Sequence, residues 1–272
     1  MKPTADPADL QNGHIGASGV PIDRNMSTSA LHKTPVAIYG AGGLGRSVHD
    51  ILLHDRCYEP VAYLDSDRRL WNTTIDGLPV RGDLATLPRL AGEGVRGVVV
   101  AIGDNPTRVR LAERVRATGL ELVSAIHPLA TIAPSARLGR HLIIGPRALI
   151  CVHAELADHC VVLSGAIVEH DNHLEAGVLL HPAARLAGGV HVGRLATLGI
   201  GACVIPYRTI GPQARVAPGA VVIRDVLPGD HVAGVPAQRI LGQRSRFVAD
   251  AARRQVVTPA AANAELKVQG AK

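Results

Sequence analysis

The strongest constraint in this sequence is an apolar period of six residues that runs through its second half. Every sixth position from Ile126 to Val222 is Ile, Leu or Val, without an insertion or a deletion. The fourth residue after each of these positions is usually small, as at Ala148, Cys160 and Ala196. Neither the 3.6-residue period of a helix nor the two-residue period of a strand produces this spacing.

A short parallel strand followed by a tight turn, repeated many times, accounts for a period of six. Three such units complete one coil of a three-sided prism. Each aliphatic side chain then points into the prism and packs on its counterpart in the next coil, at the strand spacing of about 4.8 Å. Because no coil is stable alone, stacking must bury the core. The period therefore predicts a parallel β-solenoid over residues 126–241.

Composition narrows the possible functions. The chain of 272 residues suits one or two domains, and it has no apolar stretch of about 18 residues that would predict a membrane span. Its four cysteines form no C-x-x-C pair, as expected of reduced thiols in the cytoplasm. Aromatic residues make up only 2% and arginines are scattered, so the net charge of +6 does not indicate a nucleic-acid partner.

Strand-like and helix-like segments alternate before the solenoid. Apolar runs at 35–40, 60–65 and 97–103 predict buried strands, and the patterns at 44–55 and 106–119 predict helices. This alternation is typical of a parallel sheet covered by helices. We therefore expect a small Rossmann-like α/β domain over residues 35–125.

The first turn of this domain, "GAGGLG" at 40–45, has the spacing G-x-G-x-x-G between a strand and a helix. Asp65 lies at the end of the next predicted strand, as in dinucleotide-binding folds. Glycines let the backbone approach a phosphate, and a helix N-terminus adds partial positive charge. Because any nucleotide diphosphate can use such a turn, the pattern leaves open an NAD-dependent enzyme, another nucleotide ligand, or a turn without a ligand.

One histidine of the repeat region is bracketed by carboxylates. His170 lies between Glu169 and Asp171, at a position in its repeat where the side chain projects from the prism. A neighbouring carboxylate orients an imidazole and raises its basicity, so His170 is a candidate general base. A metal site made of His170, Asp171 and His173 is disfavoured, because residues so close in sequence rarely form a ligand set without remote partners.

These motifs together resemble one class of enzymes. "VAIYGAGGLGRSV", "YLDSD" and "AIGDNPTR", followed by "GAIVEHD", "AGGVHVG", "GIGACVIP" and "VAGVPAQRI", are similar to segments of the bacterial sugar acyltransferases with a left-handed parallel β-helix of hexapeptide repeats. The UDP-amino-sugar N-acetyltransferases and the sialic acid O-acetyltransferases of surface-glycan biosynthesis resemble the chain most. The resemblance covers roughly residues 35–241 and places the two domains in the same order.

The resemblance implies a homotrimer that binds acetyl-CoA between neighbouring prisms and acts without a metal. It implies that His170 removes a proton from the sugar, that Asp171 supports it, and that the backbone N–H of Gly188 binds the thioester oxygen. Implied coenzyme contacts are Leu179, His181, Gly188, Ile200 and Pro218. Implied nucleotide-sugar contacts are Gly40, Gly42, Gly43, Asp65 and Gly103.

The chain departs from the family pattern at two positions. Members commonly have histidine where this chain has Leu44 in the Gly-rich turn, and often a histidine facing the coenzyme where it has Leu179. His181 lies two residues beyond Leu179, on the same face of a regular strand, and is the candidate replacement.

The sequence thus predicts acetyl transfer from acetyl-CoA to the amino group of a nucleotide-linked amino sugar. Cys151 and Cys160 have no adjacent base, so we expect direct transfer without an acyl-enzyme. O-acetylation of sialic acid or of another sugar hydroxyl is the alternative, followed by a metal-binding β-helix protein and an NAD-dependent enzyme. The polar segment 1–34 is expected to be disordered, and 242–272 to be a partly helical tail without an assigned role.

Overall fold

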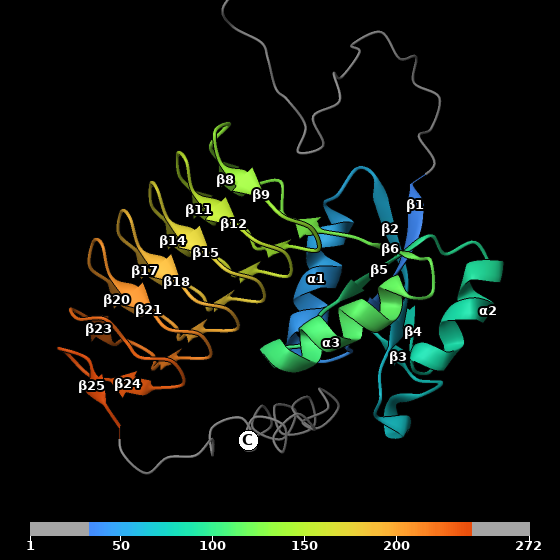
Figure 1. Cartoon of the computed structure of the whole chain (residues 1–272). Helices are drawn as coiled ribbons and strands as arrows, with labels where there is room; N and C mark the ends of the chain where they lie inside the picture. Colours follow the sequence, from blue (N-terminus) through green and yellow to red (C-terminus); the bar gives the residue numbers. More distant parts are fainter. Residues whose placement is uncertain (1–32, 241–272) are drawn as a thin grey trace, which may run out of the picture. The chain divides into compact units, whose positions relative to one another are not determined.

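The structure is a computed structural model that describes residues 33–240 of the chain. An α/β domain comes first and a solenoid of short stacked strands follows it (Figure 1). The segment 1–34 and the tail 242–272 lie outside the described residues, apart from Lys33 and Thr34. No helix in the described part is both long and apolar enough to cross a bilayer.

The α/β domain is built on a four-stranded parallel sheet in the order β2–β1–β5–β6. Its strands are β1 (Thr34–Tyr39), β2 (Tyr58–Leu64), β5 (Gly97–Val100) and β6 (Glu121–Leu122). Its helices are α1 (Gly43–Leu53), α2 (Leu87–Gly92) and α3 (Asn105–Arg116), with 3₁₀ turns at Arg68–Leu70 and Leu84–Thr86 and a hairpin of β3 (Thr74–Ile75) and β4 (Leu78–Pro79). Apolar side chains pack on both faces of the sheet, which explains the continuous apolar runs of its strands. The predicted Rossmann-like architecture is confirmed.

Two glycines shape the turn from β1 into α1. Gly40 has a φ of +111°, and a Cβ there would lie 2.6 Å from the carbonyl oxygen of Ala101. A Cβ on Gly45 would collide with the carbonyl oxygen of Gly40. The Gly-rich motif is therefore required by the close approach of helix and strand, whatever it binds.

The solenoid has three flat faces, each a parallel sheet of very short strands (Figure 1). The first face contains β7 (Ala125–Ile126), β10 (Ile143–Ile144), β13 (Val161–Val162), β16 (Leu179–Leu180), β19 (Thr197–Leu198), β22 (Arg215–Val216), β24 (His231–Ala233) and the antiparallel β25 (Gln238–Arg239). The second contains β8 (Thr131–Ile132), β11 (Leu149–Ile150), β14 (Ile167–Val168), β17 (Arg185–Leu186), β20 (Cys203–Val204) and β23 (Val221–Val222). The third contains β9 (Arg137–Leu138), β12 (Glu155–Leu156), β15 (His173–Leu174), β18 (His191–Val192) and β21 (Thr209–Ile210).

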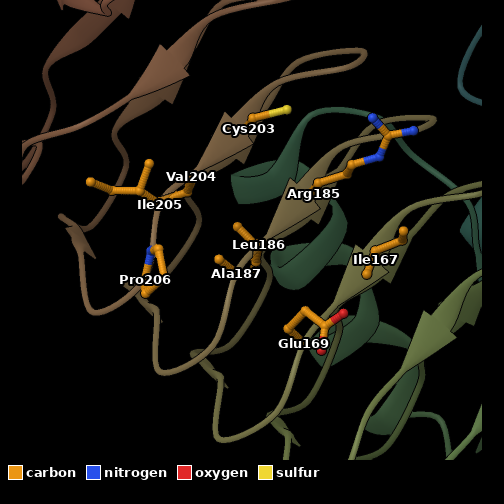
Figure 2. A pocket seen from close by; sticks show the side chains of 9 residues that line it. All are labelled: Ile167, Glu169, Arg185, Leu186, Ala187, Cys203, Val204, Ile205 and Pro206. Carbon is orange, nitrogen blue, oxygen red and sulfur yellow. The ribbon is translucent and has the colours of Figure 1, made fainter.

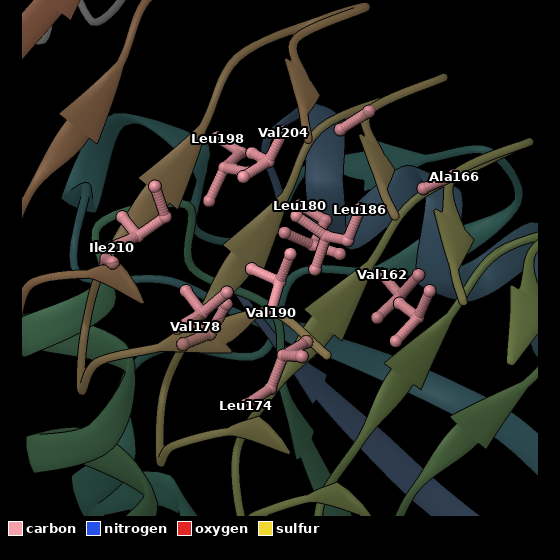
Figure 3. Close-up of a cluster of buried hydrophobic side chains, with 14 of the residues drawn as sticks. Val162, Ala166, Leu174, Val178, Leu180, Leu186, Val190, Leu198, Val204 and Ile210 are labelled. Atoms are coloured by element: carbon pink, nitrogen blue, oxygen red, sulfur yellow. The ribbon is translucent and has the colours of Figure 1, made fainter. Parts of the chain in front are cut away.

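The period of six sets the register of this left-handed β-helix. Along the first face, Val162 pairs with Leu180, which pairs in turn with Leu198, and all three are fully buried. Figure 3 shows these aliphatic side chains gathered inside the prism. The inward-facing aliphatic residues of the first coil are only partly buried, because no earlier coil covers them. Stacked columns of Ile, Leu and Val therefore form the core that the sequence predicts.

Buried polar side chains join the α/β domain to the solenoid. Arg108 of α3 is 0% exposed and donates to the carbonyl oxygens of Ile102 and Gly177, both at 2.9 Å. Burial lowers its pKa to about 10, so the guanidinium stays charged at neutral pH. Asn105 donates to the carbonyl oxygen of Leu195 at 3.0 Å. These bonds fix the position of α3 on the solenoid.

His141 also belongs to this junction, and its hydrogen bonds define its tautomer. Its Nε2 accepts the backbone N–H of Val100 at 2.9 Å, so the neutral ring carries its proton on Nδ1. That Nδ1 lies 2.9 Å from Nδ1 of His159 and donates to it. Burial, with His159 and Arg108 nearby, lowers the pKa of His141 to about 3. The histidine is therefore neutral in the folded protein across the physiological range.

This junction predicts a loss of stability in mild acid. Below about pH 6.5 the unfolded chain binds a proton at His141 that the folded chain excludes down to about pH 3, so the free energy of unfolding falls as the pH is lowered. One such proton contributes at most about 1.4 kcal/mol per pH unit. Urea denaturation at pH 7.5 and pH 5 should show a weaker pH dependence for His141→Gln than for the wild type. His153→Gln, at an exposed histidine, should behave like the wild type; equal pH dependence in all three proteins would contradict the prediction.

Candidate active site

The predicted base lies on a turn between two faces of the solenoid. His170 and Asp171 join β14 on the second face to β15 on the third. Gly188–Gly189 and Pro206–Tyr207 occupy the same place in the next two coils. We call this column of turns the His170 edge. Backbone bonds hold it in line, from Gly189 N–H to the carbonyl oxygen of His170 at 2.9 Å and from Tyr207 N–H to that of Gly188 at 3.0 Å.

A hydrogen bond at this edge orients the imidazole. Nδ1 of His170 lies 2.8 Å from a carboxylate oxygen of Asp171, and both side chains are about half exposed. Because the carboxylate only accepts hydrogen bonds, the proton of the neutral ring lies on Nδ1. The lone pair of Nε2 is then free to accept a proton from a substrate, as a general base requires.

Gly188 lies directly beneath this ring. A Cβ on Gly188 would collide with Cε1 and Nε2 of His170, so only glycine seats the imidazole in this position. The backbone N–H of Gly188 donates to no acceptor within residues 33–240. An N–H without a partner, next to a general base, is suited to bind an oxygen that becomes negative during acyl transfer. The structure thus brings together the three residues predicted to be catalytic.

A hollow of about 330 Å³ lies on the second face and reaches this edge (Figure 2). It is lined by Ile167, Glu169, Arg185, Leu186, Ala187, Cys203, Val204, Ile205 and Pro206. In Figure 2, Ile205 and Pro206 lie on one side, and Ile167 and Glu169 on the other. The lining is mostly apolar, with one acidic and one basic side chain, as is usual in small-molecule sites. The sequence did not predict this hollow, because its lining residues come from three successive coils and are therefore far apart in the sequence.

Cys151 and Cys160, the two cysteines considered as acyl carriers, are not activated nucleophiles. Burial, followed by the hydrogen bond and charge of Glu169, raises the pKa of Cys151. Cys160 is fully buried in the solenoid core, and burial raises its pKa to about 12. Since the thiolate is the nucleophilic form, neither residue is suited to carry an acyl group. This chemistry favours direct transfer.

Part of the predicted coenzyme set lies on a different edge. Ile200 and Pro218 occupy the turns that join the first face to the second, which we call the Ile200 edge. They lie in consecutive coils, linked by a 2.8 Å bond from Gly219 N–H to the carbonyl oxygen of Ile200. Ile200 is 57% exposed. His181 precedes the equivalent turn one coil earlier and is half-buried, and its burial lowers its pKa and favours the neutral ring.

The His170 and Ile200 edges border the second face on opposite sides. Six residues separate Ile200 from Pro206, so the edges of one chain lie roughly 15–20 Å apart. The catalytic group and this coenzyme group therefore do not converge in a single chain.

One apolar cluster between the α/β domain and the first face includes both Leu44 and Leu179. These are the two positions at which the family pattern has histidines. Leu179 is only 4% exposed in this cluster, and Leu44 packs against it. The two departures thus fall in the same apolar cluster, which the sequence alone did not reveal. Little of the Leu179 side chain is available to a coenzyme.

The predicted nucleotide residues surround the carboxyl ends of β1 and β5. These strands are neighbours, and the chain leaves them toward opposite sides of the sheet, which is the usual position of a nucleotide site. A Cβ on Gly43 or on Gly103 would meet nothing within 4 Å, so both face open space. Gly42 is the N-cap of α1 and provides no capping side chain.

Asp65 has a structural function in this turn. One of its carboxylate oxygens accepts the backbone N–H of Ala41, and the other accepts that of Asp67, both at 2.8 Å. The carboxylate therefore ties the Gly-rich turn to the end of β2. Any contact that Asp65 makes with a ligand must share these oxygens.

Within residues 33–240, one group of side chains has metal-ligand spacing. Ligand atoms of Asp50, His54 and His127 lie within 4.8 Å of one another. However, Nδ1 of His127 accepts the backbone N–H of Leu129 at 3.0 Å, so the neutral ring carries its proton on Nε2. Neither nitrogen of His127 then offers a free lone pair, and the cluster does not fit a metal ion.

Comparison with known proteins identifies the family. The model of the PglD N-terminal domain matches residues 35–115. The structure of PerB from Caulobacter crescentus, in complex with CoA and GDP-perosamine, is 39% identical, covers 76% of this chain and 97% of its own, and superposes with a TM-score of 0.72. A variant of the same enzyme is described as perosamine N-acetyltransferase. The chain belongs to the bacterial sugar acetyltransferases of the hexapeptide-repeat class.

Two further solved structures have the same fold. The acetyltransferase domain of PglB from Neisseria gonorrhoeae, in complex with acetyl coenzyme A, is 32% identical, with a TM-score of 0.70 and coverage of 76% of this chain and 100% of its own. WeeI from Acinetobacter baumannii is 23% identical, covers 75% of this chain and 99% of its own, and has a TM-score of 0.68, so it supports the fold alone. The family resemblance seen in the sequence is confirmed.

The contact of His170 with Gly188 predicts a specific catalytic defect. Gly188→Ala should leave the protein folded but displace the imidazole, and we expect kcat to fall by about 10²-fold or more. Gly92→Ala is the matched control, because a Cβ there meets nothing within 4 Å. Steady-state kinetics and thermal unfolding of both variants test this. Unchanged kcat in a folded Gly188→Ala protein would contradict the proposed position of the His170 imidazole against Gly188.

Proposed function

We propose that this enzyme transfers the acetyl group of acetyl-CoA to the amino group of a nucleotide-linked amino sugar, in surface-glycan biosynthesis. The observation that carries the proposal is the convergence of His170, Asp171 and the free N–H of Gly188. The relatives support both reactants, since one binds CoA with GDP-perosamine and another binds acetyl coenzyme A. N-acetylation is favoured over O-acetylation because the 39% identical relative is an N-acetyltransferase.

The chemistry follows from the three catalytic groups. The free amine of the sugar attacks the thioester carbonyl carbon, and Nε2 of His170 accepts the proton that the nitrogen loses. The carboxylate of Asp171 stabilises the resulting imidazolium, while the N–H of Gly188 binds the oxyanion. When the C–S bond breaks, the imidazolium returns its proton to the leaving sulfur. The products are an amide and CoA, and no group remains on the protein.

Binding both reactants side by side supplies much of the remaining rate acceleration. A thioester is already activated, so the enzyme's task is to hold a neutral amine at the carbonyl carbon. Fixing the two reactants in one site replaces a bimolecular encounter, an effect worth up to about 7–11 kcal/mol in favourable cases. Within this proposal, residues 35–125 hold the nucleotide and residues 126–241 perform the transfer. The nucleotide phosphates bind the Gly-rich turn at the N-terminus of α1.

A homotrimer completes the site in this proposal. The α/β domain packs on the first face, where Leu44 joins Leu163 and Leu179 in one cluster. The first face borders the Ile200 edge, whereas His170 lies on the far side of the second face. The acceptor and coenzyme residues of one chain therefore need His170 from a neighbouring chain. The free cysteines and the cytoplasmic supply of acetyl-CoA favour a cytoplasmic location.

The reaction itself is the first test. The purified protein should consume acetyl-CoA with a nucleotide-linked amino sugar and form an alkali-resistant amide, whereas an alkali-labile ester would indicate O-acetylation. His170→Ala should lower kcat by about 10²- to 10⁴-fold. His153→Ala, an exposed histidine one coil earlier on the same edge, is the control and should retain activity. Full turnover by His170→Ala would refute the assignment of the base.

Hybrid trimers test where the two edges meet. Ile200→Glu and His170→Ala should each be inactive alone. In hybrid trimers isolated with a different tag on each variant, about one site in three should be restored if each site combines two chains. No restored activity is expected if both residues serve the same site within one chain, and that result would contradict the shared site.

A further inference from the structure

The His170 edge contains one stretch without side chains, at Gly188–Gly189. The imidazole of His170 lies on Gly188, as described above, and a second ring lies on Gly189. A Cβ on Gly189 would be 2.5 Å from Cδ1 of Tyr207 and 2.7 Å from its Cε1. Tyr207 belongs to the next coil and is 72% exposed. Two rings therefore approach the same pair of glycines from the coils on either side.

The two rings do not stack on one another: among the ring contacts within residues 33–240, none joins His170 to Tyr207. The backbone of Gly188–Gly189 lies against both rings, and the N–H of Gly188 has no backbone partner within these residues. The backbone N–H of Tyr207 donates to the carbonyl oxygen of Gly188, so the chain that carries the phenol is fixed to this pair of glycines. A flat acyl group whose oxygen accepts from the N–H of Gly188 would be next to both side chains.

We propose that Tyr207 forms a wall beside the bound acyl group and limits the transferred group to acetyl; this inference rests on the proposed function. A thioester is planar, and its oxygen binds the N–H of Gly188. The amine attacks perpendicular to that plane from the side of His170. A carbon added to the acetyl methyl that leaves this plane must turn toward the other side, because the amine occupies the first. Tyr207 lies on that other side and excludes the added carbon.

Shortening the side chain of Tyr207 should change which acyl-CoA the enzyme accepts as donor. We expect Tyr207→Ala to raise the ratio of kcat/KM for butyryl-CoA to that for acetyl-CoA by about 10-fold or more, as is typical when space for a methylene is created. Tyr207→Phe retains the ring and should keep the wild-type ratio. Gln213→Ala is the matched control, because Gln213 is an exposed turn residue with the same φ of +58°, on the edge between the third and first faces.

The outcomes separate this inference from the proposed function. An unchanged donor ratio in Tyr207→Ala would overturn the inference while leaving acetyl transfer intact. Size-exclusion chromatography should show the same assembly for wild type and variant, and dissociation of Tyr207→Ala would instead identify Tyr207 as a subunit contact and overturn the inference. A wild-type enzyme that transfers no acetyl group would overturn the proposed function and, with it, this assignment.

Discussion

The packing of each aliphatic side chain on its counterpart in the next coil is the constraint on which the rest of this structure depends. Leu180 lies between Val162 and Leu198, and the same arrangement recurs on every face. Because this stacking fixes the register of the coils, it also fixes the turns between them. Residues that are one coil apart in sequence, such as His170 and Gly188, therefore become neighbours on an outer edge. A rigid core thus positions catalytic groups that are themselves half exposed.

At the His170 edge, the geometry depends on glycine as much as on the residues that carry side chains. Gly188 both makes room for the imidazole and leaves its own N–H without a partner. Asp171 then selects the tautomer by accepting the Nδ1 proton. The proposed base, the carboxylate that orients it and the proposed oxyanion donor all come from two adjacent turns, so their geometry depends on backbone hydrogen bonds of the solenoid. This arrangement is pre-organised for transfer to a nucleophile that arrives in a second substrate.

The α/β domain is attached to the solenoid by contacts that leave the His170 edge free. Arg108, Asn105 and His141 bind backbone groups across the junction, and Leu44 and Leu179 add an apolar contact beside them. Two positions where the family pattern has histidine are thus used here for packing. Leucine suits these positions, since a polar ring in this cluster would need a hydrogen-bond partner when buried. His181 lies near the Ile200 edge, not in this cluster, and as a coenzyme contact it stays a prediction.

The sequence by itself determined the solenoid and the α/β domain before it, and it singled out His170 as the candidate base. A strict period and a histidine between two carboxylates are local patterns, and the physics that they reflect acts over a few residues. Only the tertiary structure decided three further contacts. They are the position of the His170 ring on Gly188, the position of the Tyr207 ring on Gly189, and the packing of Leu44 against the cluster around Leu179. Asp65 illustrates the same limit, because the sequence indicated a ligand contact and the fold uses its oxygens to hold two backbone N–H groups. The reason is that each of these contacts joins segments a whole coil or a whole domain apart, and their distance depends on how the coils and the domains pack.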